Sequence, residues 1–229
     1  MPTPSVSAQD ILNASTTNRE RNPFRIGHHD CIITDAKLFT SAMNQDMFVT
    51  EFKVLHSQGG PYLLVKSDEQ AAGITPATLS DPHRKGETVS MAKSKNIQYP
   101  NYFSGDIKTF LVAAKTTLLN IVAGVADPAE KKAVMAHYHQ YGWDLTKNDL
   151  TSDEITAFLK NAAFDPKNPT RADNARNMFL GIPVRVSLTR SKPGARSTKK
   201  GDEAILEYPS INGVSADAAD RLMDEYAAV

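Results

Sequence analysis

Apolar and polar residues alternate along two segments in the first quarter of the chain. Residues 31–39 fall into two alternating sets, with Ile32, Thr34, Ala36 and Leu38 in one set and Ile33, Asp35, Lys37 and Phe39 in the other. A period of two predicts a half-buried β-strand. After a polar turn, residues 47–55 are rich in aromatic and β-branched side chains and predict a second strand. Phe48 and Phe52 share the parity of Val54 in this strand, so we expect both in the core.

The pattern changes to a helical period in the middle of the chain. One apolar stripe recurs every three or four positions, through Ile107, Phe110, Leu111, Ala114, Leu118 and Ile121. Asp127 followed by Pro128, and Thr151 followed by Glu154, are typical helix starts. Strands return at 183–190 and 204–208, and the loop between them predicts a β-hairpin. A short helix with Ser215 as its N-cap ends the chain.

The order of these elements is strands, then helices, then strands. Because chain ends that both supply strands usually meet in one sheet, this order predicts an α+β fold, a β-barrel with an α insertion. The barrel is expected to be OB-fold-like, five-stranded and antiparallel, with segments 62–65 and 86–92 as weaker strand candidates. The expected organisation is a flexible N-terminal arm at 1–22, one domain at 23–210 with a helical insertion at about 105–180, and an acidic tail or short helix at 211–229.

The chain lacks the sequence signatures of common enzymes and cofactor sites. GxxxxGK[ST], GxGxxG, GxSxG and HExxH are all absent. The histidines at 28–29 and 137–139 have no second cluster with zinc-ligand spacing, so we expect no metal and no cofactor. The single cysteine, Cys31, lies in a strand pattern without an activating neighbour. The sequence therefore predicts a protein that is not an enzyme.

Targeting and membrane signals are also missing from the pattern. The N-terminal residues do not combine a basic stretch with an apolar run, so no signal peptide is expected. The most apolar stretch, 110–125, is interrupted by Lys115 and Asn120 and is shorter than the ~18 apolar residues of a membrane helix. We therefore expect no membrane contact and a cytoplasmic location.

Charge is balanced over the whole chain but not along it. The 229 residues include 26 Lys and Arg and 26 Asp and Glu, which excludes a uniformly basic nucleic-acid binder. Residues 184–201 nevertheless contain six basic residues and no acidic one, namely Arg185, Arg190, Lys192, Arg196, Lys199 and Lys200. Residues 202–229 contain seven acidic residues and only Arg221 as a basic one. A hairpin with a basic tip is a candidate for phosphate contacts, and an ordinary solvated loop is the alternative.

A second basic group precedes a cluster of aromatic residues. The basic residues are Arg84, Lys85, Lys93 and Lys95, and the aromatic residues are Tyr99, Tyr102 and Phe103. Binding of a single nucleic-acid strand needs this combination, because cations follow the backbone while rings stack on bases. The alternative is that these three rings pack the insertion onto the barrel. Phe39 is a further stacking candidate, and Lys37 and Lys53 complete the candidate binding set.

Four segments of the chain carry a family resemblance. They are GHHDCIITDAKLF at 27–39, FVTEFKVL at 48–55, GDIKTFL at 105–111 and GIPVRV at 181–186. In pattern and order they resemble bacteriophage single-stranded DNA-binding proteins of the OB-fold type, over most of 24–210. The resemblance implies sequence-tolerant binding of single-stranded DNA in phage replication or recombination, without catalysis, in the host cell cytoplasm.

Partners and alternative functions remain open at this point. The acidic C-terminal residues form either a surface helix or a mobile segment that recruits replication or recombination proteins, and a homo-oligomer is left open. A phage structural or assembly protein that uses the barrel for protein–protein contacts is the second hypothesis. A hydrolase or nuclease is the third, and it would require a carboxylate cluster that binds a divalent metal.

Overall fold

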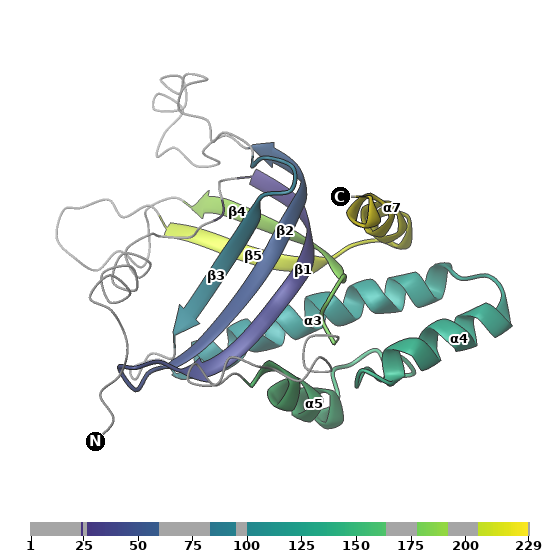
Figure 1. Ribbon diagram of the computed structural model, residues 1–229, viewed down its shortest axis with the longest axis horizontal. Helices are drawn as coiled ribbons and strands as arrows, with labels where there is room; N and C mark the ends of the chain where they lie inside the picture. Colours follow the sequence, from purple (N-terminus) through teal and green to yellow (C-terminus); the bar gives the residue numbers. More distant parts are fainter. Residues whose placement is uncertain are drawn as a thin grey trace.

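The structure is a computed structural model that describes residue 24 and residues 27–59, 83–94, 100–163, 178–191 and 206–228. The described elements are β1 (Gly27–Thr40), β2 (Asp46–Gly59), β3 (Thr88–Ser94), α3 (Pro100–Gly124), α4 (Pro128–His139), α5 (Ser152–Ala162), β4 (Pro183–Ser191), β5 (Leu206–Gly213) and α7 (Ala216–Ala227) (Figure 1). The predicted order of strands, helices and strands is confirmed, and so is the α+β class. The predicted arm at 1–22 and the strand candidate at 62–65 lie outside the described residues.

The five strands form one antiparallel sheet with the order β3-β2-β1-β4-β5. Strands β1, β2 and β3 are sequential neighbours, and β4 returns after the helices to pair with β1, which is the Greek-key order. β1 pairs with β2 along its whole length and with β4 over residues 27–32. Among the described residues β3 and β5 are the edges of an open sheet, and no pairing between them closes a barrel.

Two β-bulges, one in β2 and one in β1, change which side chains share a face of the sheet. The register with β2 shifts between Asp30 and Cys31 and again between Ile33 and Asp35. The second shift leaves Thr34 without a cross-strand partner, and a bulge of this kind reverses the alternation beyond it. The strict alternation predicted for 31–39 is therefore wrong at Thr34.

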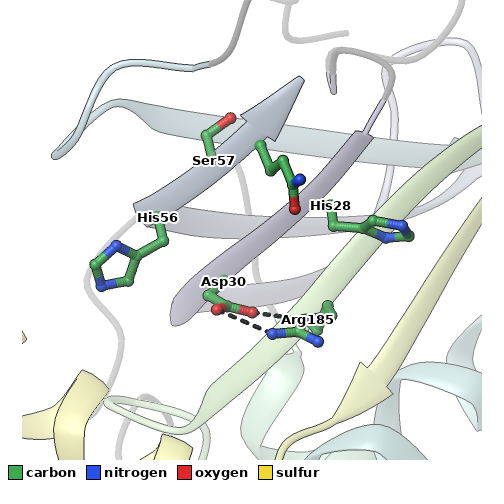
Figure 2. Close-up of a pocket in the computed structure, with 6 residues that line it drawn as sticks. His28, Asp30, His56, Ser57 and Arg185 are labelled. Carbon is green, nitrogen blue, oxygen red and sulfur yellow. Dashed lines mark hydrogen bonds and ion pairs between the residues drawn. The ribbon is translucent and has the colours of Figure 1, made fainter. Parts of the chain in front are cut away.

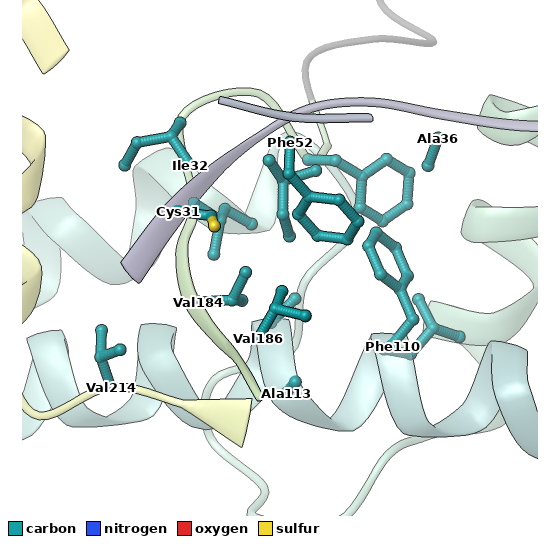
Figure 3. Close-up of a cluster of buried hydrophobic side chains, with 14 of the residues drawn as sticks. Cys31, Ile32, Ala36, Phe52, Phe110, Ala113, Val184, Val186 and Val214 are labelled. Atoms are coloured by element: carbon teal, nitrogen blue, oxygen red, sulfur yellow. The ribbon is translucent and has the colours of Figure 1, made fainter. Parts of the chain in front are cut away.

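The core lies between the sheet and α3 (Figure 3). Phe52, Val184 and Val186 from the sheet and Phe110 and Ala113 from α3 are all buried there. Burial of Phe52, and likewise of Phe48, confirms the parity argument for β2. Helix α3 thus covers the inner face of the sheet.

The C-terminal residues are part of the same core. β5 extends to Gly213, past the expected domain boundary at 210, and α7 follows after a short connection. Ala219 and Leu222 of α7 are fully buried in the common core cluster. Of the two interpretations of this region, the helix is therefore the one that the structure contains.

Helix α3 is more continuously apolar than its sequence pattern predicts. Its stretch Phe103–Gly124 has the length and composition of a helix that could cross a membrane. A core helix has the same properties, and half of the most apolar window is buried inside the protein. Phe110, Leu111 and Leu118 of this stretch all lie in the core.

The predicted helix starts are present in α4 and α5. Asp127 caps α4, because its carboxylate accepts the backbone N–H groups of Ala129 and Glu130. Thr151 and Glu154 form a reciprocal capping box at the start of α5. These local signals fix where the helices begin.

Glu154 also belongs to a buried ion pair that joins α5 to α3. Its Oε2 lies 2.8 Å from Nζ of Lys115, and both side chains are almost completely inaccessible to solvent. Nζ of Lys115 also donates to the carbonyl of Asp149 at 2.6 Å, and the N–H of Asp144 donates to Oε1 of Glu154 at 3.0 Å. The pair therefore links α3, α5 and the turn that precedes α5.

Candidate nucleic-acid interface

The face of β1 and β2 opposite the rings of Phe48 and Phe52 is called the outer face here. One of its side chains, that of Ile32, is fully buried. Cross-strand partners share a face of a sheet, so the registers assign its members. From β1 they are His28, Asp30, Ile32, Asp35, Lys37 and Phe39, and from β2 they are Met47, Val49, Glu51, Lys53, His56 and Gln58. Three predicted binding residues, Lys37, Phe39 and Lys53, are therefore brought to one face.

Lys37 lies between two carboxylates at the end of the outer face nearest the β1–β2 turn. Its Nζ is 2.7 Å from Oδ2 of Asp35 and 3.0 Å from Oε1 of Glu51. Burial lowers the pKa of Lys37, but the hydrogen bonds to Asp35 and Glu51 outweigh burial and raise it overall. Lys37 is thus charged, with its charge compensated locally. Phe39, half-buried two residues further on, supplies a ring at the same end.

Helix α7 covers the middle of the outer face. The ring of Tyr226 lies over Lys53, with 5.5 Å between Nζ and the ring centroid. The carboxylate of Glu225 accepts a hydrogen bond from Nζ of Lys85 at 2.9 Å and lies 2.9 Å from Nε2 of His56. Two predicted binding residues, Lys53 and Lys85, are therefore in contact with the C-terminal helix.

These contacts predict a pH-dependent contribution of Glu225 to stability. The hydrogen bonds from Lys85 and then His56 lower the pKa of Glu225. Because the folded pKa is the lower one, the contribution is complete above the usual glutamate value of about 4.3 and is lost as pH falls through the folded pKa. We expect wild type to melt at a higher temperature than Glu225→Gln at pH 7. The two melting temperatures should converge below about pH 4. Asp224→Asn, an exposed neighbour on α7, is the matched control, and a difference that persists unchanged in acid would contradict the prediction.

A polar pocket lies at the opposite end of the outer face, where β1, β2 and β4 meet (Figure 2). Its volume is about 250 Å³, and it is lined by His28, Asp30, His56, Ser57, Gln58 and Arg185. Arg185 holds Asp30 through two hydrogen bonds, from Nε to Oδ1 at 2.7 Å and from Nη2 to Oδ2 at 3.1 Å. The hydrogen bond to Asp30 raises the pKa of Arg185, so the guanidinium stays charged.

A second arginine approaches the same carboxylate from α7. Nη2 of Arg221 lies 3.9 Å from Oδ2 of Asp30. On the other side of the pocket, Nδ1 of His28 lies 2.8 Å from Oγ of Ser187 on β4. Sequence reasoning selected Arg185 but missed the other residues of this pocket. The alternation of side chains along residues 28–32 was the one sequence signal that could have placed His28 and Asp30 on the same face of β1.

Two predicted binding residues lie on the core side of the sheet instead. Phe103 is only 9% exposed and packs in the core, which favours the packing alternative over a stacking role for this ring. Lys93 pairs across the strands with the core residue Phe48, and its Nζ lies 3.9 Å from Oδ2 of Asp106 on α3. Lys93 therefore does not share a face with Lys37 and Lys53.

The remaining predicted residues are only partly described. Arg84 and Lys85 are exposed in the turn that leads into β3. Tyr102 lies in α3 and Arg190 lies in β4, but the structure does not describe their side chains. The other predicted residues lie outside the described residues, namely Lys95, Tyr99, Lys192, Arg196, Lys199 and Lys200.

Metal and thiol chemistry can be examined in the part of the chain that the structure describes. Within it, no group of three or more His, Cys, Asp or Glu side chains is placed to hold a metal ion. Cys31 is buried, and burial, followed by the charge of Asp30, raises the pKa of its thiol. No protein-family model matches the chain, and no curated protein matches it.

Proposed function

We propose that the protein binds single-stranded DNA on the part of the outer face of its sheet that helix α7 leaves uncovered, with little sequence preference, in phage DNA replication or recombination. The observation that carries the proposal is the Greek-key order of the five strands with the helical segment between β3 and β4. An OB-fold is a five-stranded, partly open Greek-key barrel. We propose this fold for the chain, with β3 and β5 as the strands that border the opening.

The OB-fold proposal assigns the ligand to a particular surface. OB-folds bind oligonucleotides on the face of their second and third strands and with the loops that join strands 1 to 2 and 4 to 5. In this chain the second strand carries Lys53. The connection between β4 and β5 contains Lys192, Arg196, Lys199 and Lys200. The most basic segment of the chain thus falls in one of the two loops that the fold would use.

The described face contains both kinds of group that a single strand requires. Cationic side chains neutralise phosphates and release counterions. Lys53 on the face and Arg84 in the turn before β3 are the described candidates, whereas Lys85 is paired with Glu225. Aromatic rings stack on bases without regard to sequence, and Phe39 and Tyr226 lie on or over the outer face. The ion pairs of Lys37 with Asp35 and Glu51 limit its net charge, so affinity would depend strongly on stacking and on the β4–β5 connection.

The direct test is a fluorescence titration of the protein with oligo-dT at several salt concentrations. We expect binding at low salt that weakens steeply as salt rises, with similar affinity for oligomers of different sequence. Absence of binding at low salt would overturn the proposal. Formation of a large ordered assembly without DNA would favour the structural or assembly function instead.

Charge reversal in the β4–β5 connection is a sharper prediction. The double variant Lys199→Glu/Lys200→Glu should bind oligo-dT about 10- to 100-fold more weakly at low salt. The slope of log affinity against log salt should fall in magnitude by up to about 1.4, because each lost phosphate contact removes roughly 0.7.

The matched control for this variant is Lys131→Glu/Lys132→Glu. It makes the same change in net charge with another adjacent lysine pair, on α4, which packs against α3 away from the sheet (Figure 1). We expect this control to bind with nearly the wild-type affinity. Equal losses in the two double variants would show that only net charge matters, and would remove the β4–β5 connection from the interface.

A further inference from the structure

We propose that the pocket formed by His28, His56, Gln58 and Arg185 is a phosphate-binding site, with Asp30 as the residue that positions Arg185. The register places the pocket beyond Lys53 on the outer face, and Figure 2 shows the side chains that line it. The inference rests on the proposed function, since the phosphate is taken to belong to a bound DNA strand. Its chemistry can nevertheless be tested without DNA.

The charges around the pocket leave a positive excess. Two arginines, Arg185 from β4 and Arg221 from α7, converge on the single carboxylate of Asp30. One negative charge cannot neutralise two positive charges. The carboxylate of Glu225, which lies 2.9 Å from Nε2 of His56, is also paired with Lys85. The positive charge of the two arginines therefore favours an anion as the ligand of this pocket.

Asp30 fixes the direction in which Arg185 can act. The side chain of Asp30 is only 10% exposed, whereas that of Arg185 is 48% exposed. Asp30 engages Nε and Nη2, so it uses two of the five N–H donors of the guanidinium. The remaining donors lie on the part of the fork away from Asp30, and this planar arrangement suits two oxygens of one phosphate. The buried carboxylate thus orients the arginine and leaves its donors accessible.

The rest of the lining favours a phosphate over a base. Among the described residues the lining has two imidazoles and an amide, and no Phe, Tyr or Trp ring on which a base could stack. The hydroxyl of Ser57 is already engaged by His29 and by the backbone N–H of His83. Nδ1 of His28 is engaged with Ser187, so its Nε2 is the nitrogen left to interact with a ligand. A bound phosphate would gain contacts from three directions, with Arg185, His28 and Gln58 around it.

The test compares wild type with the double variant Asp30→Asn/Arg185→Gln. This variant removes the ion pair without changing net charge, and its two amides can still hydrogen-bond across β1 and β4. Thermal unfolding checks that it folds. We expect its affinity for oligo-dT at low salt to fall about tenfold, and the salt slope to fall in magnitude by about 0.7, the value for one phosphate contact.

The single variant Asp30→Asn distinguishes the orientation of Arg185 by Asp30 from long-range attraction between the protein and DNA. This variant adds one unit of positive charge, so long-range attraction alone would strengthen DNA binding. A loss of orientation of Arg185 would weaken it, and we expect the weakening. Tighter binding by Asp30→Asn would overturn the positioning role.

Two oligo-dT probes, with and without a 5′-phosphate, distinguish the source of the phosphate. Equal losses for both probes would assign the site to an internal phosphodiester, and a loss only with the phosphorylated probe would assign it to a strand end. Either result supports a phosphate site. Wild-type affinity of the double variant for both probes would overturn it, while the loss expected for Lys199→Glu/Lys200→Glu would still uphold the proposed function.

Inorganic phosphate provides the probe that does not depend on DNA binding. NMR of the imidazole nitrogens should show saturable shifts for His28 and His56 in wild type during a millimolar phosphate titration. The double variant should show no such shifts. If wild type fails to bind DNA but shows these shifts, the proposed function fails and the phosphate site stands. No shift in wild type would overturn the site.

Discussion

Replacement of Lys115 by methionine is expected to lower the free energy of unfolding by about 3–5 kcal/mol. The substitution removes the ammonium that neutralises Glu154, and among the described residues it leaves this buried carboxylate without a partner cation. It also leaves the carbonyl of Asp149 without the donor that now lies 2.6 Å away. For a chain of this length, such a loss corresponds to a melting temperature lower by roughly 6–20 °C.

Urea unfolding of wild type, Lys115→Met, Glu154→Gln and the double variant measures this effect. The double variant should be more stable than Lys115→Met, because the glutamine oxygen still accepts a hydrogen bond and no charge remains buried. The control is Lys160→Met, at an exposed position on α5, the helix that contains Glu154. The free energy of unfolding of this variant should stay within about 0.5 kcal/mol of the wild-type value. A similarly small loss in Lys115→Met would show that the pair is not buried as described.

Gly213→Ala is expected to destabilise the protein by about 1–3 kcal/mol, through overpacking where β5 crosses α3. A Cβ atom at Gly213 would lie 2.7 Å from Cβ of Thr116 and 2.9 Å from the backbone nitrogen of Thr117. The backbone cannot move away freely, because the N–H of Val214 donates to Oγ1 of Thr117 at 3.0 Å. One added methyl group would therefore displace β5 from the helix.

Gly105→Ala is the matched control for this prediction. A Cβ atom at Gly105 would meet no atom within 4 Å, and the residue lies inside helix α3. Alanine there should raise stability by about 0.5–1 kcal/mol, because it costs less backbone entropy than glycine in a helix. Opposite signs for the two substitutions in thermal unfolding are expected. A neutral Gly213→Ala would contradict the close approach of β5 and α3.

Local patterns predicted the elements of this fold well. Alternation at 47–55 placed Phe48 and Phe52 in the core, and the cap residues Asp127 and Thr151 marked the starts of α4 and α5. These features depend on neighbours a few residues apart, so the sequence contains the necessary information. The open five-stranded sheet also followed the predicted order of strands and helices.

The candidate site was predicted less completely, because its residues meet only across the sheet. Lys37, Phe39 and Lys53 were selected and do share the outer face, whereas Phe103 is buried and Lys93 lies on the other side. Aromatic residues next to basic residues are compatible with stacking and with packing, and composition does not distinguish the two. Burial of Phe103 depends on how α3 meets the sheet.

What the sequence determined by itself was the type and order of the elements, the separation of basic and acidic segments, and the parity of the core residues in β2. What the tertiary structure decided was which distant residues meet. Asp30 and Arg185 are 155 positions apart, and they form an ion pair because β4 returns to pair with β1 in one particular register. A bulge at one residue reverses the faces beyond it, and a register between distant strands depends on the packing of the whole core.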